Sequence, residues 1–280
     1  MENSNYAELV ALVEKMPAFP KSVQRVVQLT ANLEVPAKDI VQVIECDPVL
    51  TVKILKVINS AFYGLSHKIN SVQRAVVHIG LNTVKNLAMG IAAMGMLKTS
   101  NKAGFNPSAF LLHALTTAAI SRKLAERAGL SQQACGDCFV AGLLHDFGKV
   151  VFAEFRPEGF KLALAKSKEE NMPLHLFEQE FLGIDHAEAG ALLAEKWKLS
   201  ELLIEAIRHH HDHPDNTFGE CLFAANQISK RQRYGDGGNP VTDVFPETVV
   251  NRFGLSLEAL IDDLGNLDVI AQEAELFIKP

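Results

Sequence analysis

The chain has 280 residues, of which 48% are hydrophobic and 21% charged, and its formal net charge is -6. This balance is typical of a folded protein rather than a disordered one, and the length suits one large domain or two smaller ones. The 27 Lys and Arg residues are scattered among 33 Asp and Glu residues. Nucleic-acid binding needs clustered basic residues, so we expect no nucleic-acid partner.

Targeting and membrane signals are absent from the sequence pattern. Residues 1–8 contain neither a basic segment nor an apolar one, so they do not resemble a secretory signal. The longest near-apolar stretch, residues 87–97, is far shorter than the roughly 20 residues that a spanning helix needs. Four cysteines are too few for a disulfide framework in a chain of this size. We therefore expect a cytoplasmic protein without a membrane segment.

Apolar residues recur every three or four positions along nearly the whole chain, and no period-two run is bounded by hairpin turns. This pattern predicts an all-α fold. Helix boundaries are clearly marked: Asp47 precedes Pro48 as an N-cap, and Ser71 opens a segment that Gly80 ends. We expect short helices joined by tight turns over the first 100 residues.

A polar segment with Gly and Pro, residues 99–107, is the best candidate for a subdomain boundary. We expect a smaller helical subdomain over residues 1–105 and a helical bundle with a C-terminal helical extension over residues 106–280. Two halves of one packed body fit the sequence equally well. After the boundary, the periodicity predicts helices over residues 108–128, 132–153, 157–170, 173–182, 186–197, 200–212 and 218–231. Residues 234–240 then interrupt the pattern.

Most of the ten histidines lie between residues 113 and 213. Side chains three and four residues apart share one helix face, and several of these histidines continue an apolar stripe. A lone histidine in that position is usually a hydrogen-bonded core residue. Several of them with one aspartate, on separate helices, predict a single interior pocket in which a metal ion satisfies their polar atoms. The candidates are His113, His145, Asp146, His186, His210 and His211.

The adjacent His145 and Asp146, with His113 before them and further histidines after them, resemble the HD superfamily of metal-dependent phosphohydrolases. Other segments resemble the HDOD family, a relative of the HD-GYP proteins: residues 16–20, 47–64, 75–80, 141–149, 185–190 and 206–212. The resemblance extends from residue 16 to about residue 230. It implies a bacterial regulatory module that acts through a signalling protein partner or a small phosphate-containing ligand, often without demonstrated catalysis.

Resemblance to the two-metal HD-GYP branch implies that the six candidates ligate one or two metal ions, with Asp146 as the bridging and catalytic group. Nitrogen ligands with one carboxylate suit Fe, Mn, Ni, Co or Zn better than Mg or Ca. In an active HD enzyme such ions activate water and clamp phosphoryl oxygens. Lys149, one turn after His145, is a second candidate catalytic residue that could meet a substrate phosphate. Alternatively, it is a solvated cation at the end of its helix.

The sequence also departs from the catalytic relatives. Asn226 stands where they supply a second aspartate ligand, and an amide oxygen is a weaker ligand than a carboxylate. Alternatively, Asn226 only forms hydrogen bonds inside the bundle. The Gly-Tyr-Pro element of the cyclic-dinucleotide hydrolases is missing after His211. We therefore expect an HDOD-type signal-transduction module with a histidine-rich metal-binding cleft. The alternative is a metal-dependent phosphohydrolase that acts on a nucleotide or a phosphodiester.

Overall fold

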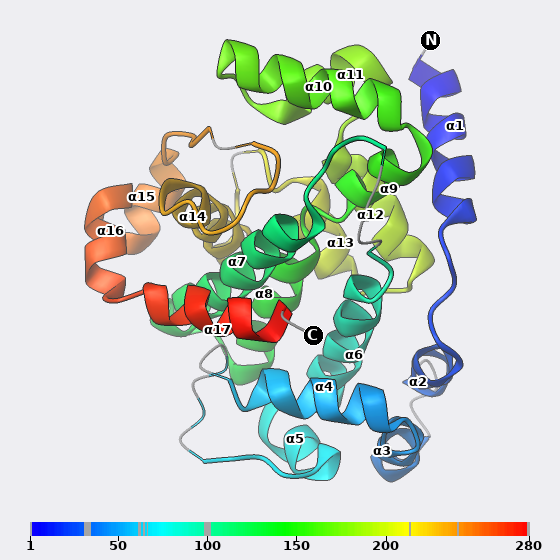
Figure 1. The fold of residues 1–280 in the computed structure, drawn as a ribbon. Helices are drawn as coiled ribbons and strands as arrows, with labels where there is room; N and C mark the ends of the chain where they lie inside the picture. Colours follow the sequence, from blue (N-terminus) through cyan, green and yellow to red (C-terminus); the bar gives the residue numbers. More distant parts are fainter. Residues whose placement is uncertain are drawn as a thin grey trace.

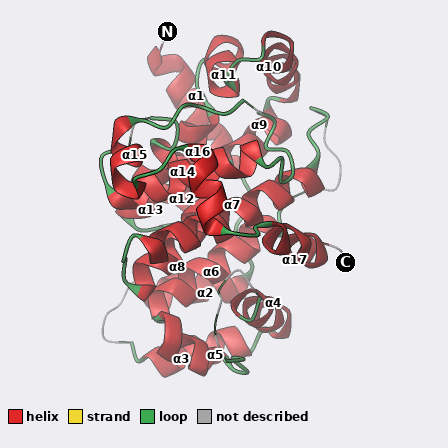
Figure 2. Ribbon diagram, turned by 90° about the vertical axis from the view of Figure 1, so that its left-hand side faces the viewer, coloured by secondary structure: helices red, strands yellow, loops and turns green. Residues whose placement is uncertain are grey.

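The computed structural model describes residues 2–30, 35–60, 63, 65, 67–97, 102–212, 214–239 and 241–278, and the regular elements of these residues are all α-helices joined by loops (Figure 2). The all-α prediction is confirmed. The first six helices are α1 (Glu2–Lys15), α2 (Lys21–Thr30), α3 (Ala37–Glu45), α4 (Pro48–Ile58), α5 (Val72–Ile79) and α6 (Leu81–Met94). The others are α7 (Pro107–Arg127), α8 (Gln132–Leu144), α9 (Gly148–Phe155), α10 (Pro157–Glu170), α11 (Leu174–Leu182), α12 (His186–Lys196), α13 (Glu201–Arg208), α14 (Thr217–Arg231), α15 (Glu247–Phe253), α16 (Leu257–Leu264) and α17 (Asp268–Ile278).

Helices α7, α8 and α14 form the centre of the molecule, with α2 to α5 at one end and α10 and α11 at the other (Figure 1). Helix α1 does not stay with the N-terminal helices but packs against α12. There the Lys196 ammonium donates to the backbone carbonyls of Val13 and Glu14, at 2.9 and 2.8 Å. The division at residue 105 stays a prediction, and residues 99–101 of the proposed boundary lie outside the described residues.

Two glycines allow the central helices to approach closely enough to build a site between them. A Cβ atom on Gly142 of α8 would lie 2.6 Å from the Cα atom of Ala118 on α7. A Cβ atom on Gly148 of α9 would lie 2.0 Å from the carbonyl oxygen of His186 on α12. Both positions exclude any larger residue, because the obstructing atoms belong to the backbone. The segment between these glycines is therefore pressed against α7 on one side and α12 on the other.

The helix boundaries marked in the sequence are found in the structure. The Asp47 carboxylate accepts a hydrogen bond from the Leu50 amide at 3.0 Å, as an N-cap residue should. The Ser71 hydroxyl likewise accepts from the Arg74 amide at 3.2 Å. Gly80 ends α5 with a φ of 82°, a conformation that few other residues adopt.

Two predicted helices are wrong in extent. The single helix expected over residues 132–153 is broken after Leu144, because hydrogen bonds to the third preceding carbonyl replace the usual ladder at Phe147 and Lys149. The helix expected over residues 200–212 ends at Arg208. A short turn follows the end of each helix, and these two turns carry His145, Asp146, His210 and His211.

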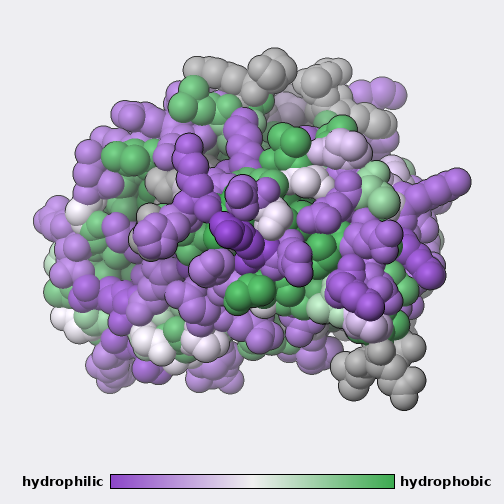
Figure 3. All heavy atoms as spheres, turned by 90° about the horizontal axis from the view of Figure 1, so that it is seen from below, coloured by the Kyte–Doolittle hydropathy of each residue, from purple (hydrophilic) through white to green (hydrophobic). Residues whose placement is uncertain are grey.

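The lower face of the molecule, formed by the N-terminal helices, is mostly hydrophilic with small separate hydrophobic groups (Figure 3). Its exposed apolar side chains include Val49 and Val52 on α4 and Val77 on α5. Isolated apolar residues of this kind are normal on a protein surface. Among the described helices, none combines the length and the apolar character needed to cross a bilayer.

We predict that Asp47→Ala lowers the free energy of unfolding by about 1 kcal/mol, the usual cost of losing an N-cap. Hydrogen bonds from Ser22 and the Leu50 amide lower the pKa of the Asp47 carboxyl. This stabilisation is therefore complete above the ordinary pKa of 3.8 and is lost as the pH falls through the lower pKa of the folded state. Urea unfolding at several pH values measures both effects, with the exposed Glu45→Ala as the matched control. Equal losses in the two variants would contradict the assignment.

Candidate metal centre

The Asp146 carboxylate lies at the break between α8 and α9 and is almost fully buried. Its Oδ2 atom lies 3.5 Å from Nε2 of His113 and 3.4 Å from Nε2 of His145. Its Oδ1 atom lies 3.1 Å from Nε2 of His186 and 3.6 Å from Nε2 of His210. Residues from four separate segments thus point their Nε2 atoms at one carboxylate, with two rings at each oxygen.

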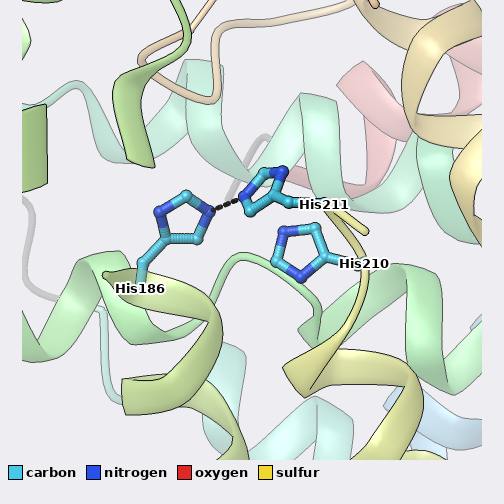
Figure 4. Close-up of side chains that lie close together, drawn as sticks. All are labelled: His186, His210 and His211. Atoms are coloured by element: carbon cyan, nitrogen blue, oxygen red, sulfur yellow. Dashed lines mark hydrogen bonds between the residues drawn. The ribbon is translucent and has the colours of Figure 1, made fainter. Parts of the chain in front are cut away.

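His211 contacts this arrangement through the rings of His186 and His210. Its Nε2 atom lies 2.8 Å from Nε2 of His186, and its ring centroid is 3.9 Å from that of His210 (Figure 4). The ligand atoms form two groups, each compact enough for one ion: His113, His145 and Asp146 in one, and His186, His210 and His211 in the other. The structure therefore brings all six predicted ligands together, and Asp146 presents one oxygen to each side.

The end of α13 explains how two consecutive histidines share the site. In a continuous helix, neighbouring side chains point about 100° apart. Because α13 ends at Arg208, His210 and His211 occupy the following turn and both turn their rings inward. His209 takes the outward position, where its Nδ1 atom lies 2.7 Å from the Asp212 carboxylate. The resemblance likewise left His209 outside the ligand set.

The opposite ring nitrogens fix the orientation of three imidazoles. Nδ1 of His145 donates to the Gly142 carbonyl at 2.8 Å, and Nδ1 of His210 donates to the Ile207 carbonyl at 2.6 Å. Nδ1 of His186 is bonded to the fully buried Glu178 carboxylate, which also accepts from the His186 amide at 2.9 Å. A neutral imidazole that donates through Nδ1 presents a bare lone pair at Nε2.

Burial lowers the pKa of both His113 and His210 to about 3, so both rings are neutral at physiological pH. Burial also acts to lower the pKa of His186, but the charge of Glu178 raises it above the ordinary value. Burial also acts to raise the pKa of Asp146, but the charges of His145 and Lys149 hold that pKa well below its usual value. The lone pairs of His113 and His210 consequently face an ionised carboxylate. The Nε2 atoms of His113, His145 and His210 and Oδ1 of Asp146 have no hydrogen-bond partner in the described structure.

Facing acceptors of this kind are costly unless a cation lies between them. The donor set of five imidazoles and one carboxylate fits a first-row transition metal, and hard cations such as Mg²⁺ prefer oxygen. The hydrogen bonds made by the Nδ1 atoms are the type of outer contact that orients histidine ligands. The residues present therefore suit a transition-metal ion on either side of Asp146.

Lys149 is buried, and the alternative that it is a solvated helix-end cation is wrong. Its Nζ atom lies 2.7 Å from Oδ2 of Asp146 and donates to the Gly237 carbonyl at 2.7 Å. Lys149 lies in the first turn of α9, three residues after Asp146, and its amide donates to the Asp146 carbonyl at 3.0 Å. The catalytic roles of Lys149 and Asp146 remain predictions.

Residues 235–239, which we call the glycine strap, lie across one side of the cluster. The Asp236 amide donates to the Ala109 carbonyl on α7 at 2.9 Å, which fixes the strap to the helix that carries His113. A Cβ atom on Gly237 would lie 2.8 Å from Oδ2 of Asp146 and 2.9 Å from Cδ2 of His113. The strap therefore passes so close to the site that only glycine fits at position 237.

Asn226 lies on α14 and is almost completely buried, but its Oδ1 atom has no hydrogen-bond partner among the described residues. The alternative that this oxygen only serves a hydrogen bond inside the bundle is thus not supported. The role of Asn226 as a weak ligand stays a prediction.

Several residues near the site were missed by sequence reasoning. His175 stacks on His211 with ring centroids 4.4 Å apart, and Glu178 holds His186. Their spacing of three residues on one helix is a signal, but it resembles any polar helix face. Lys230, one turn after Asn226, is also buried. Gly237 belongs to the interruption at residues 234–240, and sequence alone gave no reason to place that segment at the site.

The chain matches the family model of the HDOD domain over residues 16–213. It belongs to the HDOD family. The match spans both the N-terminal helices and the histidine cluster, so the resemblance inferred from separate motifs is confirmed.

The HDOD fold is shared along almost the whole chain with solved structures. A presumed phosphohydrolase from Shewanella amazonensis SB2B is 22% identical with a TM-score of 0.71, covering 97% of this chain and 98% of its own. A presumed signal transduction protein from Marinobacter aquaeolei VT8 is 24% identical with a TM-score of 0.71, covering 99% of this chain and 66% of its own. An uncharacterized protein of Treponema pallidum (strain Nichols) is 27% identical over 254 residues. These are 90% of this chain but 48% of that relative, so the chain spans about half its length.

We predict that Gly237→Ala forces the glycine strap away from the cluster and lowers the free energy of unfolding by about 1–3 kcal/mol, as overpacking usually does. The added methyl group meets buried atoms of Asp146 and His113 that have no room to move. Gly95→Ala, whose Cβ atom meets nothing nearer than 3.3 Å, is the control. Chemical unfolding measures the difference. An unchanged stability of Gly237→Ala would show that the strap does not pack on the site.

Proposed function

We propose that this chain is an HDOD signal-transduction module whose His-Asp cluster holds one or two divalent transition-metal ions. One observation carries the proposal: bare Nε2 atoms surround the buried Asp146 carboxylate without hydrogen bonds to satisfy them. Family membership supports the signalling role, since the HDOD resemblance implies a regulatory module. The module would respond to a small phosphate-containing ligand or a signalling protein, most simply in the bacterial cytoplasm.

In this proposal, His113 and His145 would hold an ion on one side of Asp146, and His186, His210 and His211 would hold one on the other side. A metal bound there would lower the pKa of a coordinated water and offset negative charge on a phosphoryl group. Asp146 presents one oxygen to each side, and Glu178 keeps the His186 ring turned toward it. The buried position of the cluster excludes bulk water and strengthens these interactions.

We predict that protein purified without chelators contains one or two transition-metal ions per chain and that Asp146→Asn loses most of them. The substitution removes the only carboxylate within the two ligand groups. Elemental analysis by mass spectrometry measures the metal content, and circular dichroism shows whether the variant is folded. Asp212→Asn is the matched control, because Asp212 is an exposed carboxylate beside His209 and outside both groups.

His210→Ala provides a second route to the same result if Asp146→Asn does not fold. Less than one ion per wild-type chain would remove the metal proposal. Equal metal content in the wild type and in Asp146→Asn would assign the ions to other residues.

The second candidate function is a metal-dependent phosphohydrolase that acts on a nucleotide or a phosphodiester. The position of Lys149 favours it, since a buried ammonium beside the bridging carboxylate is where a phosphoryl oxygen could be neutralised. The neutral Asn226 opposes it, because an amide poises a metal-bound water less well than a carboxylate. The same ligand set thus supports either ligand sensing or slow hydrolysis.

For an active hydrolase, we predict that Lys149→Met lowers kcat/KM for phosphate release at least about tenfold, through the loss of one charge-assisted contact. Phosphate release from a panel of nucleotides and phosphodiesters measures the rate, with the exposed Lys161→Met as the control. The metal content of both variants must be recorded, so that loss of metal is not mistaken for loss of catalysis. Activity that survives Asp146→Asn would not arise from this site.

A further inference from the structure

His211 is the one candidate ligand of the six that is partly exposed to solvent, whereas the other five are buried. On the side of His113, the glycine strap lies so close to Asp146 that a Cβ atom on Gly237 would have no room. The most direct way from solvent to the ligands therefore leads past the turn at residues 209–212, which carries His211 (Figure 4).

Two surface hollows flank this turn, and each of them reaches one ligand. The first, of about 650 Å³, lies between α13 and the start of α14, and its lining includes His210. The second, of about 340 Å³, lies between α11, the start of α12 and the turn, and its lining includes His211. His209 and Asp212 line both hollows, so the two adjoin on either side of one short ridge.

Carboxylates dominate the lining of both hollows. The described lining of the first contains neither Lys nor Arg. In that of the second, Arg208 is the only such residue, and it is already bonded to Glu188 at 3.0 Å and to Glu205 at 2.5 Å. The acidic residues that line the two hollows are Asp185, Glu188, Glu201, Glu205, Asp212 and Asp215.

This concentration of negative charge favours a cation. The whole chain has a formal net charge of only -6, yet six carboxylates and one guanidinium meet around this single turn. Concave surfaces lined by one sign of charge raise the local concentration of counter-ions and their association rates, by about 10- to 1,000-fold. The same charges disfavour a free anion, so we assign these hollows to a cation and not to a phosphate-containing ligand.

Unsatisfied ring nitrogens lie at the inner end of the hollows. His210, in the lining of the first, is 3% exposed, and its Nε2 atom has no hydrogen-bond partner among the described residues. His211, in the lining of the second, places its Nε2 atom 2.8 Å from that of His186. These three residues form one of the two compact ligand groups. The acidic surface therefore leads directly to nitrogen atoms that suit a transition-metal ion.

We propose that the two hollows beside the turn at residues 209–212 are the entry route for the metal. Their carboxylates collect a hydrated divalent transition-metal ion from solution and deliver it to the group of His186, His210 and His211. This inference deepens the proposed function and rests on it for the presence of a metal at the cluster. Because these carboxylates lie outside both ligand groups, they set the rate at which the metal enters and not the number of ions held.

The test is the rate of Zn²⁺ uptake by the full chain after a chelator has removed its metal, followed by stopped-flow fluorescence of a zinc indicator. The variant is Glu201→Gln/Glu205→Gln/Asp212→Asn, which neutralises exposed carboxylates of the first hollow and, through Asp212, of the second. We expect its uptake at low ionic strength to be at least about fivefold slower than that of the wild type. The difference should shrink as salt is added, because salt screens exposed charges.

Glu45→Gln/Asp262→Asn/Glu275→Gln is the matched control, because it makes the same change of charge at exposed positions on α3, α16 and α17. It should change the uptake rate less than about twofold. Both variants should reach the metal content of the wild type when Zn²⁺ is saturating, as measured by elemental analysis. Glu201→Gln/Asp212→Asn, which keeps the bond between Glu205 and Arg208, serves as a second variant if the first does not fold.

Equal uptake rates in the variant and its matched control would overturn the entry route. A slower rate in the variant that does not respond to salt would overturn it as well, because steering by exposed charges is screened. Both results leave the metal proposal intact, since that proposal is measured by the ion content at equilibrium. No uptake of Zn²⁺ by the wild type would instead reject the metal proposal, and the entry route with it.

Discussion

A single buried carboxylate organises this molecule. Asp146 is ionised in the interior, where the Lys149 ammonium pairs with it. Three imidazoles are oriented by bonds from Nδ1 to carbonyls and to Glu178. The Nε2 atoms of His113, His145 and His210 have no hydrogen-bond partner among the described residues. Acceptors that converge in this way require a cation, and this requirement links the fold to the proposed chemistry.

The helices are arranged to meet that requirement. Glycines at positions 142 and 148 allow the segment with His145 and Asp146 to lie against the backbones of α7 and α12. The early ends of α8 and α13 convert helical residues into turns, where consecutive side chains can converge. The glycine strap then closes over the carboxylate, because only a residue without a side chain fits at position 237. Close packing around a polar centre thus explains features that would weaken an ordinary helical core.

The charges expected around the metal ions of a catalytic HD enzyme differ from those of the residues in this chain. Asn226 is neutral where the catalytic relatives are expected to have a carboxylate, while Lys149 adds a buried positive charge beside Asp146. A module that binds a phosphate-containing ligand beside a metal would meet the needs of signalling without requiring rapid turnover.

The sequence by itself determined the helical class, most helix ends and the identity of the six candidate ligands, because periodicity, caps and neighbouring His and Asp residues are local signals. It also carried the family motifs over residues 16 to about 230. Only the tertiary structure decided that α8 stops before His145, that Lys149 is buried, and that Glu178 and Gly237 meet the cluster. These features depend on contacts between segments far apart in the chain, where a buried lysine and a solvated one have the same local pattern. Burial and pairing are properties of the packed molecule, and no single segment encodes them.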